Sequence, residues 1–270
     1  MDLEQADAAA RLRYSYSEMQ LGDTAWDPPA PLALAVGSFV AYIVVFALAF
    51  VTPLPSAIAL ESMKKIHNYA LAAYSAFCCG FTVWWLIAHG HTTADRFMCV
   101  DFAGAGADLV TTSFAISKVW EWGDTILLVW GNRIRGKPWT WTNKTVLHCF
   151  HHSTTFWLFL IVSVMPCSKK TGTLLNGGVH TVMYFYYADP SVFPKKWTPL
   201  ITQGQIAQLI TVTLLWNITP RYCPEFATFP ETHPAEFATP QFFVITYIIM
   251  FMAFYAKRFK KDDASQKKMR

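Results

Sequence analysis

Residues 32–52 read LALAVGSFVAYIVVFALAFVT and contain no charged side chain. A helix of about 20 apolar residues is long enough to cross the ~30 Å hydrocarbon core of a bilayer. Further apolar segments of similar length follow, so the sequence predicts an all-α polytopic membrane protein with seven transmembrane helices. The predicted spans are residues 32–52, 69–88, 108–131, 145–165, 172–189, 199–217 and 239–256.

The composition of the whole chain agrees with a membrane class. Of the 270 residues, 53% are hydrophobic and only 15% are charged, whereas an ordinary soluble domain has about 25% charged residues. A disordered or nucleic-acid-binding chain would be more polar and richer in charge. We therefore expect the lipid bilayer as a partner and no nucleic acid.

Three parts are predicted along the chain: a polar N-terminal segment (1–31), a seven-helix membrane domain (32–256) and a basic tail (257–270). The N-terminal segment is acidic, unlike the basic start of a signal peptide, so the first span is expected to be retained. The positive-inside rule places the C-terminus in the cytosol. An odd number of spans then places the N-terminus on the opposite side of the membrane, in the lumen.

Two features outside the spans bear on location, and each has two interpretations. Lys267 and Lys268 resemble a dilysine retrieval signal of the endoplasmic reticulum, although a basic tail can also simply bind anionic lipid. We favour retrieval, which predicts a multi-pass protein of the endoplasmic-reticulum membrane. Cys99 and Cys223 both fall in lumenal loops, where they could form a disulfide or remain two free thiols.

The strongest polar cluster is LHCFHH at residues 147–152. His148, His151 and His152 fall on one face of a helix, because successive residues are rotated by about 100°. Three imidazoles on one face can ligate a metal, relay protons or include a nucleophile. Ordinary core histidines would rarely occur three in five residues.

A second cluster, KVWEWGDT at residues 118–125, places charges inside a predicted span. Lys118, Glu121 and Thr125 share a helix face, and Asp124 lies close to it. A structural salt bridge could explain part of this pattern. Ionisable groups inside a membrane are nevertheless candidates for a functional site, because burying their charge is costly.

Two further stripes lie in the fifth and sixth predicted spans. Asn176, His180, Met183, Tyr184 and Tyr187 share one face of the fifth span. An aromatic belt at the membrane surface would explain some of the tyrosines but not an asparagine and a histidine within a span. The sixth span carries Thr202, Gln205 and Gln208, for which a ligand role and interhelical hydrogen bonding are equally open.

Two other classes of membrane protein could account for part of this pattern. Membrane di-iron desaturases and hydroxylases also use an HxxHH pattern, but they need about eight histidines in several boxes. This chain has 8 histidines in total and a single HxxHH, so the ligands are too few. A non-catalytic lipid transporter is the third alternative.

Taken together, the four clusters resemble the ELO family of very-long-chain fatty-acid elongases. The matching patterns are KxxExxDT from Lys118, HxxHH from His148, NxxxHxxMYxYY from Asn176 and TxxQxxQ from Thr202, in family order. The resemblance implies a 3-ketoacyl-CoA synthase that condenses a long-chain acyl-CoA with malonyl-CoA. It further implies six helices in an inverted barrel around an acyl tunnel, and a disulfide between Cys99 and Cys223.

The resemblance also implies roles for individual residues. His151 would be the nucleophile that forms an acyl-imidazole, with His148, His152 and His180 orienting it, moving its proton or stabilising the enolate. Lys118, Glu121 and Asp124 complete the expected catalytic set. The expected substrate-binding residues include hydrogen-bonding side chains and cationic side chains near the cytosolic mouth: Asn176, Tyr184, Tyr187, Thr202, Gln205, Gln208, Arg133, Arg135 and Lys137.

Topology alone explains those cationic residues equally well, so their role in binding CoA stays a hypothesis. No metal and no resident cofactor is expected, since malonyl-CoA and acyl-CoA are substrates. The expected protein partners are the reductases and dehydratase of the elongation cycle, with a homodimer as an open alternative.

Overall fold

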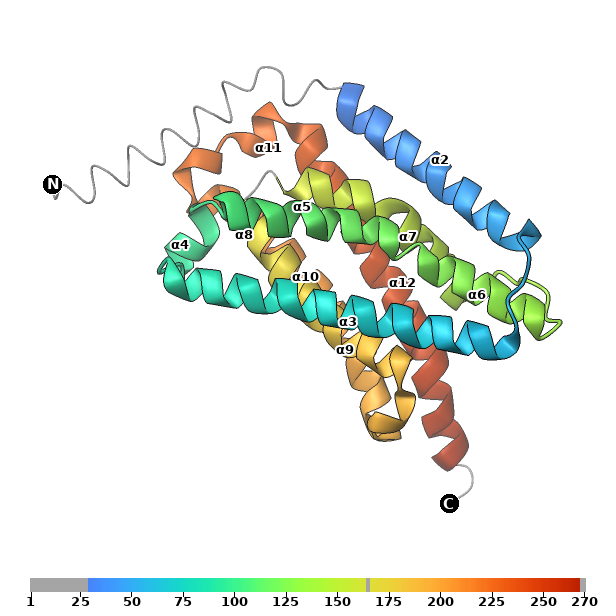
Figure 1. The fold of residues 1–270 in the computed structure, drawn as a ribbon. Coiled ribbons are helices and arrows are strands. Elements are labelled where there is room, and N and C mark those ends of the chain that lie inside the picture. The colour runs from blue at the N-terminus through green and yellow to red at the C-terminus, as the bar shows by residue number, and fades with distance from the viewer. Residues whose placement is uncertain (1–28, 164–165, 268–270) are drawn as a thin grey trace, which may run out of the picture.

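The computed structural model describes residues 29–163 and 166–267. Every regular element in these two ranges is helical (Figure 1). Most of the polar N-terminal segment and Lys268 of the dilysine motif lie outside the described residues. The elements are α2 (Pro29–Val51), α3 (Ala57–Ala88), α4 (Ala94–Cys99), α5 (Ala105–Trp120), α6 (Gly123–Ile134), α7 (Asn143–Val162), α8 (Pro166–Thr171), η1 (Gly172–Asn176), α9 (Gly177–Ala188), η2 (Pro190–Val192), η3 (Lys195–Trp197), α10 (Thr198–Tyr222), η4 (Pro224–Phe226), α11 (Phe229–Thr232) and α12 (Pro234–Lys267).

Four of these helices are long and apolar enough to cross a membrane, judged by length and composition. They are α2 over Ala33–Val51, α3 over Ala57–Ala88, α7 over Asn143–Val162 and α12 over Pro234–Phe259. Large apolar side chains on them are exposed, including Val40 on α2, Ile66 on α3 and Ile249 on α12. Exposed apolar surface of this extent suits contact with lipid tails, so the chain is a multi-pass membrane protein.

Neighbouring helices surround a common interior. α3 packs against α9, α9 against α10, α10 against α12, and α12 against α7. α7 in turn packs against α5, and α5 and α6 both pack against α3. α2 instead packs on α6 and α7, along the side of the bundle (Figure 1).

The predicted span at 108–131 is broken into two helices. α5 ends at Trp120 and α6 begins at Gly123, with Glu121 and Trp122 forming a turn between them. The indole nitrogen of Trp122 donates a hydrogen bond to the backbone oxygen of His152, at 2.9 Å, which attaches the turn to α7. The break therefore places the acidic residues of this segment beside the histidines of α7.

The predicted span at 69–88 is part of a longer helix. α3 begins at Ala57, where the Ser56 hydroxyl accepts a hydrogen bond from the backbone nitrogen of Ala59. This is an ordinary N-cap, which stabilises the first turn. Charged residues in 57–68, including Glu61 and Lys64, lower the local hydropathy. The apolar pattern of the sequence therefore predicts only the later part of this helix.

The region from Pro166 to Ala188 combines α8, a π-helical turn and α9. A Cβ on Gly177 would lie 3.1 Å from the backbone oxygen of Ser75, and a Cβ on Gly172 would lie 2.5 Å from the Phe159 ring. The absence of side chains at these two positions lets α9 approach α3, and η1 approach α7, closely. Asn176 and His180 are thereby brought to the interior.

At one end of the bundle, α4, α8 and α11 form a cap (left in Figure 1). A disulfide joins Cys99 to Cys223, and both cysteines pack with Met98, Trp216 and Phe226 in an apolar cluster. The structure thus contains the pairing that the family resemblance implies. It joins the end of α4 to the end of α10, across 124 residues of sequence.

Lys170 is the charged centre of this cap and is fully buried. Its ammonium group donates hydrogen bonds to the backbone oxygens of Arg96, Phe97 and Val100, at 2.9, 2.7 and 2.5 Å. Burial lowers the pKa of Lys170 to about 8, so the cationic form still predominates at neutral pH. Three donors therefore satisfy three carbonyl groups around the C-terminal end of α4.

Candidate active site

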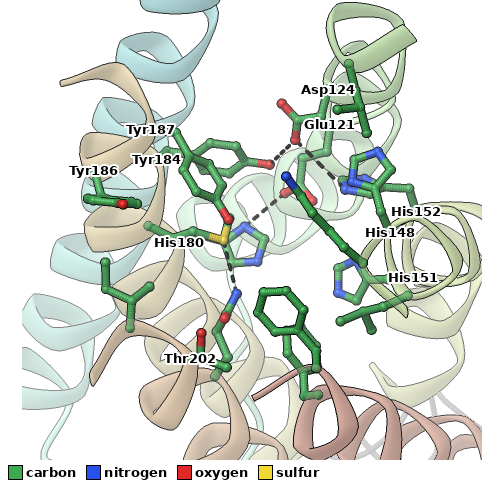
Figure 2. A pocket seen from close by; sticks show the side chains of 18 of the residues that line it. Glu121, Asp124, His148, His151, His152, His180, Tyr184, Tyr186, Tyr187 and Thr202 are labelled. Atoms are coloured by element: carbon green, nitrogen blue, oxygen red, sulfur yellow. Dashed lines mark hydrogen bonds and ion pairs between the residues drawn. The ribbon is translucent and has the colours of Figure 1, made fainter. Parts of the chain in front are cut away.

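The interior of the bundle holds a cavity of about 400 Å³ in which the predicted motifs meet (Figure 2). Polar residues from α6, α7, α9 and α10 line it together with apolar and cationic side chains. The lining residues are Lys64, Asn68, Glu121, Asp124, Leu127, Leu128, Arg135, Lys144, Leu147, His148, His151, His152, His180, Met183, Tyr184, Tyr186, Tyr187, Thr198, Ile201, Thr202, Gln205, Gln208, Leu209, Phe251, Phe254, Arg258 and Phe259.

The three histidines of α7 face this cavity, as their helical spacing predicts. His148 Nε2 lies 2.9 Å from the Thr125 hydroxyl, which is 3.1 Å from the hydroxyl of Tyr42 on α2. The rings of His148 and His152 are 4.3 Å apart between centroids. Tyr42 of α2 is thus connected to His148 through the hydroxyl of Thr125.

His151 has a different environment. Its ring lies against aromatic side chains of α12, with centroids 5.2 Å from Tyr247 and 6.4 Å from Phe251. No hydrogen bond joins this imidazole to another residue in the described ranges. The nitrogens of His151, which lines the cavity, are therefore free to react with a molecule bound there.

Asp124 is held by contacts to both of its carboxylate oxygens. The Tyr184 hydroxyl donates a hydrogen bond to Oδ2 at 2.7 Å, and His67 Nε2 lies 2.8 Å from Oδ1. His152 Nε2 lies 3.9 Å from Oδ2. The carboxylate is consequently placed where it can stabilise a proton on His152.

Glu121 is the centre of a second, more deeply buried group. Lys118 Nζ donates to Glu121 Oε1 at 2.7 Å and to Asn176 Oδ1 at 2.9 Å, and lies 4.3 Å from the Phe114 ring centroid. His180 Nδ1 lies 3.2 Å from the same Glu121 oxygen. Because a buried carboxylate is costly without compensation, Lys118 stabilises the charge that faces His180.

Several polar atoms of this site have no hydrogen-bond partner among the described residues. They are Glu121 Oε2, His152 Nδ1 and Gln208 Oε1, all fully shielded from solvent. Buried polar atoms are normally paired, so unpaired atoms that gather around one cavity indicate places for a ligand. Within the described part of the chain, no group of three or more His, Cys, Asp or Glu side chains is arranged to hold a metal ion.

The remaining predicted residues fall into two sets. Tyr184, Tyr187, Thr202, Gln205 and Gln208 line the cavity, and Gln205 Nε2 lies 3.1 Å from the sulfur of Met183. Lys118 and Asn176 do not line the cavity: Lys118 pairs with Glu121, and Asn176 accepts a hydrogen bond from Lys118.

Of the three cationic residues predicted to bind substrate, Arg135 lines the cavity. Arg133 instead donates to the backbone oxygens of Ala49 and Thr52, at the end of α2, and Lys137 is exposed away from the lining. Lys64, Lys144 and Arg258 line the cavity from α3, α7 and α12.

Two contact residues have no local signal in the sequence. His67 and Tyr42 reach the site from helices that precede the motifs, over sequence separations of 57 and 83 residues. His67 stands in the polar first part of α3 without a recognisable motif around it, and Tyr42 stands inside the first apolar run of the chain. Only the crossing of the helices shows that these two side chains belong to the site.

A family described as ELO, the GNS1/SUR4 family, matches this chain over residues 26–267. Mouse very long chain fatty acid elongase 5 is 33% identical over 132 residues, which cover 46% of this chain and 42% of that protein. Mouse very long chain fatty acid elongase 2 is 28% identical over 226 residues, covering 78% of this chain and 70% of the relative. Human very long chain fatty acid elongase 5 is 33% identical over 46% of this chain and 42% of its own length. Alignments to the elongase 5 proteins thus span less than half the length of those relatives.

Proposed function

The chain belongs to the GNS1/SUR4 family, also called ELO, and on that premise we propose that it is the condensing enzyme of fatty-acid elongation. A 3-oxoacyl-CoA synthase of this kind joins a long-chain acyl-CoA to malonyl-CoA. One proton is consumed, and 3-oxoacyl-CoA, CO2 and CoA are released. The observation that carries the proposal is the convergence of four histidines and two carboxylates on one cavity that also has apolar and cationic walls.

For the architecture, we propose seven transmembrane segments, of which six form an inverted barrel around an acyl tunnel and α2 lies outside. The succession of contacts α3–α9–α10–α12–α7–α5 supports this arrangement. Leu127, Ile201, Leu209 and Phe254 supply apolar lining suited to an acyl chain. A closed barrel would also exclude bulk water, which would otherwise hydrolyse a thioester or an acylated histidine.

The first proposed step is acylation of His151. A nitrogen of the neutral imidazole attacks the thioester carbonyl carbon, the carbon–sulfur bond breaks, and CoA leaves as a thiolate. The proton lost by the imidazole passes to that thiolate, which gives CoA and an acyl-imidazole. The free nitrogens of His151 and its place beside Phe251 suit a nucleophile that must meet an apolar substrate.

The second step forms the carbon–carbon bond. Malonyl-CoA loses CO2, and the electron pair of the broken bond becomes an enolate that attacks the acyl carbon. The bond from this carbon to imidazole nitrogen breaks, and the nitrogen takes up the proton that the reaction consumes. His152 Nδ1, which has no hydrogen-bond partner among the described residues, would donate a hydrogen bond to the enolate oxygen, in the manner of an oxyanion hole.

Hydrogen-bonding residues would hold the thioester groups. We assign this role to Thr202, Gln205, Gln208, Tyr184 and Tyr187, which line the same cavity. Asn176 would act through Lys118, to which it is hydrogen bonded. In this scheme Gln208 Oε1, an acceptor without a partner in the described ranges, would accept a hydrogen bond from an amide N–H of the pantetheine arm of CoA.

The CoA phosphates would bind to four cationic side chains on the cavity wall: Lys64, Arg135, Lys144 and Arg258. Lys137 is a matched control, since it lies on the same connection as Arg135 but does not line the cavity. Arg135→Glu should raise KM for both CoA substrates several-fold, with a smaller change for Lys137→Glu. Equal KM values in both variants and the wild type would contradict this assignment.

We further propose that the protein acts in the endoplasmic-reticulum membrane with its C-terminus cytosolic and its N-terminus lumenal. The basic tail and the position of the cysteine pair support this orientation. No resident cofactor is required by the chemistry. The reductases and dehydratase that act on the product are its proposed partners, and a homodimer is compatible with the fold.

The decisive assay uses purified protein, acyl-CoA and malonyl-CoA, with mass-spectrometric detection of 3-oxoacyl-CoA two carbons longer. A panel of acyl-CoA substrates would define chain length and unsaturation. Binding of acyl-CoA without product would indicate a lipid transporter. Oxygen-dependent desaturation or hydroxylation with stoichiometric iron would indicate a di-iron enzyme.

A further inference from the structure

His67 contacts the candidate site from α3, outside the four sequence clusters. Its Nε2 atom lies 2.8 Å from Asp124 Oδ1. A carboxylate oxygen only accepts hydrogen bonds, so Nε2 must carry the proton and donate it. The side chain has a relative exposure of 11%, which makes it part of the interior rather than of the surface.

Gly123, which begins α6, provides the space that the His67 ring occupies. A Cβ built on Gly123 would lie 2.8 Å from His67 Cε1 and 3.3 Å from Nδ1. The first distance is shorter than real side-chain contacts, so any side chain at position 123 would displace the ring. The contact of His67 with Asp124 therefore depends on a glycine at the neighbouring position, which is an observation independent of the hydrogen bond.

The His67 bond completes the restraint of Asp124. Tyr184 donates to the other carboxylate oxygen, Oδ2, at 2.7 Å. Without His67, the carboxylate could rotate about its terminal torsion, which is broad for aspartate. Since Oδ2 also lies 3.9 Å from His152 Nε2, such rotation would change the electrostatic environment of a histidine that lines the cavity.

We propose that His67 is a positioning residue for the condensation, acting by holding the Asp124 carboxylate toward His152. This inference rests on the proposed function. His67 does not line the cavity, so its effect on substrate is indirect. A carboxylate fixed beside an imidazole determines which nitrogen holds the proton and stabilises the imidazolium form. The protonation steps of the reaction thereby become sensitive to a residue on α3.

Four variants test this role: His67→Ala, His67→Gln, Gly123→Ala and the double variant His67→Ala with Gly123→Ala. Loss of a group that orients a reactive residue typically costs about 10–100-fold in activity. We expect His67→Ala and Gly123→Ala each to lower kcat by about this factor, with KM for both CoA substrates changed less than about twofold. His67→Gln should recover part of the activity, because its amide can donate to Asp124.

The double variant separates positioning from a general loss of packing. If the added methyl group acts only by displacing His67, Gly123→Ala should cost nothing further once His67 is alanine. Gly80→Ala on α3 is the matched glycine control, since a Cβ there meets no atom within 4 Å, and His233→Gln tests an exposed histidine. Both controls should retain wild-type kcat.

Three results would overturn the proposal: wild-type kcat in Gly123→Ala, losses that multiply in the double variant, or a His67→Gln variant no better than His67→Ala. Thermal unfolding in detergent accompanies each assay. If His67→Ala does not fold, Gly123→Ala and His67→Gln still decide the question through the ratio of kcat to KM effects. A wild-type protein that makes no 3-oxoacyl-CoA would instead refute the proposed function.

Discussion

Two buried lysines show how differently the same kind of residue is used in two regions of this molecule. Lys170, in the cap, donates to three backbone oxygens of the α4 end. Lys118, in the site, pairs with Glu121 and Asn176, while the second oxygen of Glu121 finds no partner among the described residues. Lys170 belongs to a closed structural network, whereas the network of Lys118 ends at the cavity.

The comparison shows that a buried charge does not by itself identify a functional site. Both lysines are shielded from solvent, with relative exposures of 3% for Lys118 and 0% for Lys170. What distinguishes them is the nature of their partners: Lys170 donates to backbone oxygens at the end of α4, whereas Lys118 pairs with a carboxylate that lines the cavity and keeps one oxygen without a partner in the described ranges. Unpaired atoms that gather at a cavity mark the region where substrate is expected to complete the hydrogen bonding.

The largest expected effect is on the reactive histidine of the site. His151→Ala should lower kcat on the order of 10⁴- to 10⁶-fold, because loss of a nucleophile leaves only binding and electrostatic stabilisation. The unfolding temperature should change little, since the imidazole makes no hydrogen bond to the described residues. Product formation and thermal unfolding check both parts. A kcat within tenfold of wild type would contradict the nucleophilic role.

The next largest effects are expected when each of the two buried lysines is replaced by methionine. Lys118→Met should destabilise the fold by about 3–5 kcal/mol, because Glu121 would be left as an unpaired buried charge. The folded fraction should also have a lower kcat. Lys170→Met should destabilise by about 1–3 kcal/mol through unsatisfied carbonyl groups, with kcat per folded molecule unchanged. A selective loss of kcat in Lys170→Met would contradict the distinction between cap and site.

The disulfide tests the cap alone. Cys99→Ser with Cys223→Ser should lower the free energy of unfolding by about 2–5 kcal/mol, as expected when a native bridge is removed. Below the unfolding transition, kcat and KM should match those of the wild type. A second double variant, Cys78→Ser with Cys79→Ser, controls for cysteine loss in general. An altered KM in the disulfide variant at low temperature would show that the cap influences the site, and would contradict a purely structural role for the cap.

The smallest expected effect comes from Tyr42, the contribution of α2 to the site. Tyr42→Phe removes the hydroxyl that lies beside Thr125 and so loosens the contact to His148. One neutral hydrogen bond is worth about 0.5–1.5 kcal/mol, so kcat should fall only about two- to tenfold. Steady-state kinetics would detect this, with Tyr74→Phe as the control for loss of a hydroxyl from a half-buried tyrosine. Equal kcat in wild type and Tyr42→Phe would show that α2 does not contribute to catalysis through this hydroxyl.

Much of the site could be predicted because it follows helical periodicity. His148, His151 and His152 face one cavity since three and four residues make about one turn. The predicted apolar segments at 32–52, 145–165 and 239–256 likewise lie largely within long helices. Local spacing is sufficient for such features, because one helix determines both the pattern and the direction of its side chains.

The remaining features depend on contacts between distant segments. His67 becomes part of the site only because α3 passes the start of α6, where Gly123 leaves room for the ring. The break at Glu121 and Trp122 is equally hidden in the sequence, because the charges within 108–131 do not reveal that the segment forms two helices. The same holds for the cations: Arg133 and Arg135 are two residues apart, yet one joins the end of α2 and the other lines the cavity.

The covalent role of His151 is the central claim, and intact-mass spectrometry tests it most directly. Purified protein is incubated with acyl-CoA in the absence of malonyl-CoA, and the protein mass and free CoA are measured together. We expect a mass increase equal to one acyl group, with stoichiometric release of CoA. This increase should be absent in His151→Ala and lost when malonyl-CoA is added. An unmodified wild-type protein that releases CoA only after malonyl-CoA is supplied would contradict it.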